Sequence, residues 1–473
     1  MIRTFVLFVV VDIATAAAQE PLPSATFSEP PMRGVGTSSA DTPSSVPEVL
    51  LSQEPMNSPG ALDSGVQPPI AGRAASLPTE SNRAFATLEP TFRLRGRIEA
   101  DATSALQSQS SRDVLGDLQD GFGFRRVRIG AQGSIEDSAS WVSEVELAGG
   151  SVRIRDVFVG LDAIPGVNQI RIGNFREPYN LEGMTSSNFI TFMERSAQNV
   201  LSPVRNWGVC SFWWREDERL LFSLGGFRDG TGNDGQSFGD DGRGAYTARL
   251  TGLPVYNPSD DAFRLVHVGA AFSQRSPPNG VLNFTRRIGS NILTVDDNPG
   301  SPFLPSLQIA ANDYQLYNLQ AARVVGPFTL QAEWSAAAVQ QIGAGSIFVH
   351  GMYVSAGYFL TGEHRAYNRT RGSFDQVEVL YPVTRSRSVA RRGRGAVEVA
   401  ARFAYLDFNS ANLPPDNNGN PAGTDLYEIA AGLNWYLNTN TRIMFDYTAG
   451  IPNKVGFEPT VAHICGVRTA VFW

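Results

Sequence analysis

The feature that most constrains this chain is a two-residue alternation of apolar and polar side chains that recurs from about residue 91 to residue 473. Between residues 92 and 101, apolar or small residues take the even positions, and arginine, glutamate and aspartate take the odd positions. Similar alternation returns at residues 126–132, 397–405, 442–447 and 467–473. A period of two is that of a β-strand with one apolar face and one polar face.

Sequences typical of turns separate these strands, among them residues 298–300, residues 417–419 and the proline pairs at 277–278 and 414–415. Alternating strands of about ten residues with such turns are typical of outer-membrane barrels. No run of eighteen apolar residues follows the N-terminal segment, so we expect no membrane-spanning helix. In a membrane the strands must then close, because an open sheet edge leaves backbone groups without partners. We therefore predict an all-β fold, a transmembrane antiparallel β-barrel.

Composition divides the chain into three parts. Residues 1–18 have an early arginine, a short apolar run and a small-residue ending, the order of a secretory signal peptide. Residues 19–90 are rich in proline and serine and poor in aromatic residues, so they predict a disordered linker that cannot form a packed core. We expect residues 91–473 to form the barrel. The predicted location is the outer membrane of a Gram-negative-type envelope, after export.

Several function classes are disfavoured by composition. Two cysteines and four histidines in 473 residues argue against a metal site, and a net charge of −7 gives no reason to expect nucleic acid. We predict no cofactor and no enzymatic activity. A Ser-His hydrolase built on a barrel is the enzymatic alternative, but none of the histidines (His267, His350, His364 and His463) stands in a catalytic motif. Nothing in the spacing of Cys210 and Cys465 predicts a disulfide, so we expect free thiols that face lipid.

Four longer stretches carry a more specific signal: Phe124-Arg125-Arg126-Val127-Arg128, the block from residue 173 to residue 208, residues 358–365 and residues 433–438. Together they resemble, in order, the phosphate-selective porin O and P family. The resemblance implies a sixteen-stranded barrel, a homotrimer in an outer membrane, and a segment after the Gly173 strand that folds inward to narrow the pore.

The parity of the alternation also predicts which side chains line a lumen. If the apolar face meets lipid, these arginines point inward: Arg93, Arg95, Arg97, Arg126, Arg128, Arg402, Arg442 and Arg468. Arg125 has the opposite parity, so we expect it near a rim or a bend. Arginine suits oxyanions because its planar fork donates paired hydrogen bonds and stays charged. The alternative for each arginine is a structural ion pair, such as Arg402 with Glu398 on the same strand.

The resemblance adds candidate site residues to these. It implies that Arg125 and Arg126 belong to an anion-binding constriction and that Ser186 and Ser187 of the inward loop meet the passing ion. Arg195 lies in the same block and either joins them or anchors the loop. Arg286 and Arg287 stand where the family has a second inward arginine loop. The family pattern is broken at Gly183, where a lysine is expected, and Lys454 is the only lysine of the chain.

These observations predict an outer-membrane porin, a water-filled channel for passive diffusion of small solutes. We expect it to prefer anions, with selectivity for phosphate as the more specific expectation. Its expected partners are small anions such as phosphate, outer-membrane lipid and further copies of itself. A general non-selective porin and a structural barrel that tethers the envelope through residues 19–90 stay open as alternatives.

Overall fold

The computed structural model describes residues 90–136, 138–162, 164–230, 244–259, 263–295, 304–383, 393–410, 412–413, 423–454 and 456–473. All of them belong to the unit that runs from Arg83 to Trp473. The predicted signal peptide and linker lie outside the described residues, apart from Pro90.

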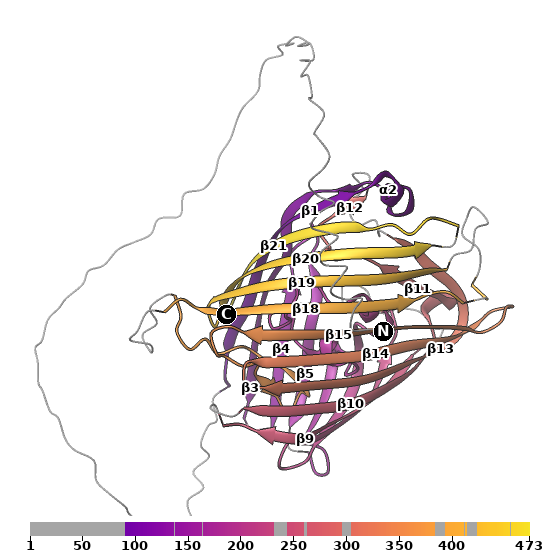
Figure 1. The fold of residues 1–473 in the computed structure, drawn as a ribbon. Coiled ribbons are helices and arrows are strands. Elements are labelled where there is room, and N and C mark those ends of the chain that lie inside the picture. The colour runs from indigo at the N-terminus through magenta and orange to yellow at the C-terminus, as the bar shows by residue number, and fades with distance from the viewer. Residues whose placement is uncertain are drawn as a thin grey trace, which may run out of the picture. The chain divides into compact units, whose positions relative to one another are not determined.

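Sixteen antiparallel strands of the described residues form one closed wall, because β1 pairs with β3 on one side and with β21 on the other (Figure 1). Consecutive wall strands pair with one another throughout. They are β1 (Arg93–Gln107), β3 (Gly121–Ile135), β4 (Ala139–Glu146), β5 (Arg153–Asp162), β6 (Gln169–Arg176), β7 (Arg205–Trp214), β8 (Leu220–Arg228), β9 (Ala245–Asn257), β10 (Arg264–Arg275), β13 (Leu304–Val325), β14 (Phe328–Gln341), β15 (Ile347–Phe359), β18 (Ala396–Asp407), β19 (Thr424–Asn438), β20 (Thr441–Lys454) and β21 (Ala462–Phe472). The predicted sixteen-stranded barrel is confirmed.

Shorter elements lie in the connections between wall strands. They are α2 (Gln109–Leu115), β2 (Leu118–Gln119), α3 (Leu181–Met184), η1 (Ala197–Leu201), η3 (Pro278–Gly280), β11 (Val281–Arg286), β12 (Thr294–Val295), β16 (Tyr367–Asn368) and β17 (Ser373–Phe374). In the described part of the chain, no helix combines the length and the hydropathy needed to cross a bilayer.

The alternation in sequence becomes an alternation of faces. Leu94 and Ile98 on β1 are 57% and 41% exposed, whereas Arg97 and Glu99 are 4% and 2% exposed. Apolar side chains therefore cover the outside of the wall and charged side chains fill its inside, the arrangement that a barrel in lipid requires.

β1 and β21 lie side by side at the seam of the barrel (Figure 1). The backbones of Gly96 and Trp473 exchange two hydrogen bonds of 3.0 and 3.1 Å. A Cβ atom on Gly96 would lie 2.3 Å from the Trp473 ring and 2.8 Å from the carbonyl oxygen of Arg128. Only glycine leaves room for the terminal tryptophan at this place in the seam.

The two ends of the barrel differ. At the turn end, short connections such as residues 326–327 and 439–440 join neighbouring strands, whereas the loop end carries longer connections. Two segments from opposite ends fold into the lumen: the inward loop, residues 177–204 between β6 and β7, and the inward turn, the described residues between β15 and β18. They meet where the backbone N–H of Phe374 donates to the hydroxyl of Thr185 (3.3 Å). The predicted inward loop is confirmed, whereas the inward turn was not predicted.

An apolar core lies inside the barrel, in addition to the apolar outer surface. It includes Tyr179 and Leu201 of the inward loop, Ile288 and Leu293 of the connection between β10 and β13 (the outer loop, residues 276–295), and Leu406 of the wall. These side chains are at most 1% exposed. Part of the lumen is thus packed rather than open.

Candidate functional site

The inward loop has little regular structure, so its backbone polar groups need partners from elsewhere. Carboxylates of three wall strands accept hydrogen bonds from its backbone N–H groups. Glu333 of β14 accepts from Leu181 and Glu182 (2.8 and 2.7 Å). Asp446 of β20 accepts from Met193 (2.6 Å), and Glu428 of β19 accepts from Ala197 (3.2 Å). Arginines donate hydrogen bonds to its backbone carbonyl groups. From the wall, Arg402 donates to the carbonyl of Glu194 (2.9 Å), Arg442 to that of Ile190 (2.8 Å) and Arg468 to that of Met193. Within the loop, Arg195 donates to the carbonyls of Glu182 and Thr185 (2.9 and 2.7 Å). Charged side chains therefore fix the course of the loop.

Glu194, at the tip of the inward loop, is the centre of an ion-pair cluster. Its carboxylate accepts two hydrogen bonds from Arg125 (2.5 and 3.0 Å) and one from Arg468 (3.0 Å), and it lies 3.7 Å from a guanidinium nitrogen of Arg126. Burial alone would raise the pKa of the Glu194 carboxyl, but the three guanidinium groups outweigh burial and hold that pKa well below its usual value.

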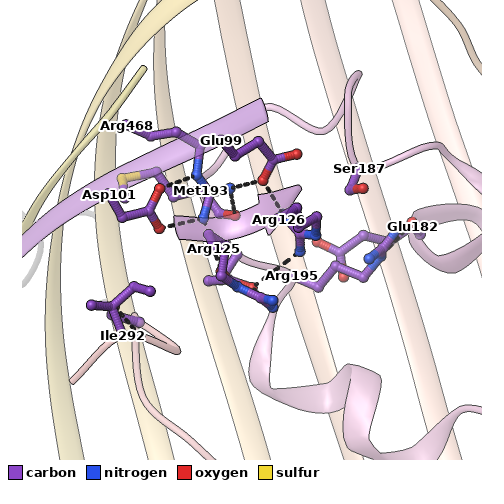
Figure 2. Close-up of polar contacts among 12 residues, drawn as sticks. Glu99, Asp101, Arg125, Arg126, Glu182, Ser187, Met193, Arg195, Ile292 and Arg468 are labelled. Carbon is purple, nitrogen blue, oxygen red and sulfur yellow. Dashed lines mark hydrogen bonds and ion pairs between the residues drawn. The ribbon is translucent and has the colours of Figure 1, made fainter. Parts of the chain in front are cut away.

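Two wall carboxylates complete this cluster (Figure 2). Arg468 makes a bidentate pair with Asp101 (2.7 and 2.7 Å), and Arg126 pairs with Glu99. Each arginine of the cluster therefore faces a carboxylate, and the cluster ties β1, β3 and β21 to the inward loop.

Arg125 reaches the lumen through a β-bulge. The register of β1 and β3 pairs Glu99 with Arg126 but Ala100 with Phe124, so Arg125 is the extra residue. A bulge re-aims a side chain, which explains how a residue with lipid-facing parity comes to contact Glu194. The expectation of a bend at Arg125 is confirmed.

The open part of the lumen contains a cavity of about 300 Å³, here called the inner cavity, against β1 and β3 to β7. Its lining includes eleven arginines. Six of them were predicted from the sequence: Arg95, Arg97, Arg125, Arg126, Arg128 and Arg195. The other five were not: Arg155, Arg171, Arg176, Arg205 and Arg371. Among its described lining residues, Asp156 is the only one that carries a carboxylate.

A second cavity of about 380 Å³, the outer cavity, lies between the inward loop and the outer loop. Arg287 lines it, together with Leu406 and Leu426 near the loop end of the wall. Arg125, Arg126 and Arg195 line both cavities. These three arginines therefore stand at the junction between the two spaces.

Ion pairs cancel only part of the positive charge around the inner cavity. The carboxylate of Glu144 lies within 4 Å of three guanidinium groups, those of Arg95, Arg97 and Arg128. The carboxylate of Glu146 lies within 4 Å of Arg128 and Arg155. Asp156 pairs with Arg205 (2.8 Å). With Glu99 and Glu194, five carboxylates face eleven arginines. Within the described residues, no carboxylate lies within 4 Å of Arg171, Arg176, Arg195 or Arg371. The cavity is therefore strongly cationic.

The remaining predicted residues have different positions. Ser186 and Ser187 line the inner cavity, and the Ser187 hydroxyl accepts a hydrogen bond from Arg97 (2.6 Å). Arg402, Arg442 and Arg468 point inward as predicted, but their side chains hold the inward loop. Arg93 lies at the exposed start of β1, and the side chain of Arg286 lies outside the described part of the structure.

Two expectations need correction. Arg402 is not braced by Glu398; its nearest carboxylate is Glu182 (3.8 Å), while Glu398 accepts from Asn434 and Tyr436. Both cysteines are free, but only Cys465 is exposed on the outer face. Cys210 is buried among aromatic residues inside the wall, because its strand presents the intervening residues to lipid.

The missed arginines were only partly accessible to sequence reasoning. Arg171 lies in a short alternating segment between Ile170 and Ile172, so extending the parity argument to this segment would have found it. Arg155 has the parity of the lipid-facing Val159 and Leu161, and it reaches the cavity where the register of β4 and β5 shifts. Arg371 belongs to the inward turn, whose path no periodicity encodes.

A closed sixteen-stranded barrel with an apolar outer surface and a polar inner passage is an outer-membrane porin, and the family and fold indicate a channel rather than an enzyme. The family model for phosphate-selective porin O and P matches residues 92–461, and the chain belongs to this family. It is 24% identical to Porin O of Pseudomonas aeruginosa over 78% of this chain and 84% of that one. It is also 25% identical to an uncharacterized protein of Caulobacter vibrioides, over 85% of this chain and 78% of that one.

Solved structures show the same fold. OprB of Pseudomonas putida aligns with a TM-score of 0.50 at 10% identity, over 81% of this chain and 94% of that one. At such identity the likeness concerns the barrel and not what passes through it.

Proposed function

We propose that this porin is an anion-preferring diffusion channel that admits phosphate among other small anions. The observation that carries the proposal is the junction of the two cavities, where Arg125, Arg126 and Arg195 line both spaces and the inner one contains eleven arginines.

The physical argument rests on the excess of positive charge in a narrow aqueous space. A lumen lined by one sign of charge with low-dielectric walls concentrates counter-ions and excludes ions of its own sign. Guanidinium groups add directed N–H donors that match the oxygens of an oxyanion. Buried carboxylates lower this excess but do not abolish it, because five carboxylates face eleven arginines.

We assign the roles within the passage as follows. Arg125, Arg126 and Arg195 form the filter, and Ser186 and Ser187 offer hydroxyl donors beside it. Arg287 attracts anions in the outer cavity, with Arg286 next to it in sequence. Arg95, Arg97 and Arg128 continue the cationic surface into the inner cavity, and Arg93 stands at its rim.

Phosphate is proposed as one permeant anion rather than the only one. Gly183 stands where the family pattern has a lysine, and a Cβ atom there would lie 2.0 Å from the Asn180 side-chain oxygen. A lysine therefore does not fit this loop unless Asn180 moves. With fewer free cations in the loop, discrimination among anions should be weaker than the preference for anions over cations.

The proposal extends to the rest of the protein. Residues 1–18 are removed on export, residues 19–90 form a spacer, and residues 91–473 form the barrel that assembles as a homotrimer. The sequence pattern and the family support these assignments. N-terminal sequencing of the protein purified from outer membranes, together with its mass in detergent, tests them.

The test of selectivity is planar-bilayer recording of the full-length protein in a KCl gradient, with and without added inorganic phosphate. We expect a reversal potential of the sign that favours anions and a reduced chloride current when phosphate is added. A reversal potential that favours cations would overturn the proposal. A reversal potential near zero without block by phosphate would favour a general non-selective porin instead.

A further inference from the structure

A second group of charges in the inner cavity lies away from the junction. Arg171 is the third residue of β6, close to the turn end, and Arg371 enters the cavity from the inward turn. Neither residue lines the outer cavity. These two arginines approach the cavity from different segments of the chain, so their proximity is a property of the fold.

Arg171 is held by aromatic rings instead of by a carboxylate. Its guanidinium carbon lies 4.4 Å from the ring centroid of Phe158, 4.7 Å from that of Phe212 and 5.3 Å from that of Phe175. Cation–π contacts hold the side chain in place but leave its net charge uncancelled. One terminal nitrogen donates to Gln169 (2.8 Å), and the buried Nε has no hydrogen-bond partner.

The backbone at Arg371 is fixed to the wall. Arg249 of β9 donates to the carbonyl oxygens of Arg371 and Gly372 (3.2 and 2.6 Å), and the Arg371 N–H donates to Asn368 (3.0 Å). Gly372 has a φ of +60°, and a Cβ atom there would lie 2.9 Å from the Thr251 hydroxyl. The turn is thus locked, whereas the side chain of Arg371 stays exposed in the cavity.

Arg171 and Arg371 line the same cavity, where their guanidinium groups repel each other. The carboxylates of Asp156 and Asp162 attract Arg171 only from beyond 4 Å, and no carboxylate of the described residues lies within 4 Å of either arginine. The repulsion between two like charges that share an aqueous space is relieved by an anion between them. The geometry points to a second anion-binding site at the turn end of the inner cavity, formed by Arg171 and Arg371, that takes small oxyanions in series with the junction. This inference rests on the proposed function, because it concerns the same passage.

Two sites in series have a clear advantage for conduction. An anion that occupies one site is repelled by an anion that enters the other, so binding does not prevent release. An anion that leaves Arg125 and Arg126 would next reach Arg171 and Arg371 before it exits at the turn end.

The experiment compares four variants of the full-length protein in planar bilayers: Arg371→Gln, Arg371→Lys, Arg171→Gln and the control Arg215→Gln. Arg215 lies in the turn after β7, at the same end of the barrel, but it is exposed, pairs with Asp217 and does not line the inner cavity. Its replacement makes the same change of charge outside the passage. Single-channel conductance in 1 M KCl, where the screening length is about 3 Å, checks that each pore is intact.

In a gradient at low salt, we expect Arg371→Gln and Arg171→Gln each to lower the anion-to-cation permeability ratio about threefold, as one charge lost from a narrow aqueous space implies. Arg371→Lys should keep this ratio and weaken block by inorganic phosphate, because lysine keeps the charge but not the planar fork. Arg215→Gln should match the wild type in both measurements.

The outcomes separate the two proposals. If the wild type prefers anions and both glutamine variants behave like it, the second site is overturned and the proposed function stands. If Arg215→Gln lowers the ratio as much as Arg371→Gln, the effect is one of general charge at this end, and the second site is again overturned. If the wild type has no preference for anions, the proposed function fails, and the second site fails with it.

Discussion

Two sides of the same lumen use arginine for different purposes. On the open side, formed by β1 and β3 to β7, arginines face the inner cavity and outnumber their carboxylate partners. On the filled side, formed by β9, β10, β13 to β15 and β18 to β20, inward-facing arginines such as Arg249 and Arg275 are buried and donate to other protein groups. Arg275 of β10 binds Glu177 (2.8 and 3.0 Å) and Asp229 (2.6 Å) and is 1% exposed.

Residue type and inward parity therefore do not by themselves define a pore. An inward-facing arginine adds positive charge to the passage only if no partner cancels that charge and if its side chain faces open space. Arg249 shows the same point, because it is 2% exposed and donates only to neutral oxygens of Gln320 and of the inward turn. Packing on one side leaves the inner cavity on the other.

The largest expected effect comes from breaking a pair on the filled side. In Arg275→Ala the fully buried carboxylate of Glu177 loses its partner, which we expect to lower the free energy of unfolding by about 3–5 kcal/mol. Urea unfolding in detergent, monitored by tryptophan fluorescence, measures this change in the free energy of unfolding. Arg215→Ala, in the exposed pair with Asp217, is the matched control and should cause no measurable change. Equal stability of the two variants would show that the filled side does not stabilise the barrel in this way.

A smaller effect, on selectivity, should come from the junction on the open side. Arg126→Gln removes a charge that lines both cavities, and we expect the anion-to-cation permeability ratio to fall about fivefold, equivalent to about 1 kcal/mol. Reversal potentials in a KCl gradient measure this ratio. Arg323→Gln, on the outer face of β13, is the control. An unaltered ratio in Arg126→Gln would remove this arginine from the filter.

The smallest effect should come from the carboxylate of the junction. Glu194→Gln leaves Arg125, Arg126 and Arg468 less neutralised, so we expect the same ratio to rise about two- to threefold. The other contacts of the inward loop, such as Glu333 with Leu181, should hold it in place. A ratio that falls would mean that Glu194 positions the loop rather than lowers its charge.

The pKa of Glu194 sharpens this test. Because that pKa is depressed in the folded protein, its contribution to stability is complete above the unfolded carboxyl pKa of about 4.3 and is lost only as the pH falls through the lower folded value. The difference in the permeability ratio between Glu194→Gln and the wild type should therefore persist from pH 7 to about pH 3.5, where a carboxyl group with the unfolded pKa would be mostly protonated. A difference that disappears by about pH 3.5 would show that the three arginines do not hold the pKa down.

Much of the wall could be predicted, because lipid outside and water inside impose a strict alternation. That parity placed Arg97 and Arg126 in the lumen, and its violation at Arg125 pointed to a bend that the structure shows as a bulge. The inward loop came from the family resemblance. The inward turn and Arg371 could not be predicted, because a segment held by single contacts such as that of Tyr367 with His267 (2.6 Å) has no periodicity.

The loop-holding role of Arg402, Arg442 and Arg468 was equally inaccessible, since it depends on carbonyl groups about 200 or more residues away along the chain. The prediction that Cys210 faces lipid was wrong, because the alternation along residues 205–214 places Cys210 on the inner face of β7.

The hydrogen bonds between Gly96 and Trp473 have a consequence for biogenesis. The partners across this seam are far apart in translation order: Asp101 and Arg468 are separated by 367 residues. Until β21 is made, β1 has an unsatisfied edge, which hydrocarbon does not tolerate. Insertion into the bilayer must therefore wait until β21 has been synthesised, or a helper protein must cover the edge of β1 until then. In either case the barrel closes, and its lumen forms, only at the end of synthesis.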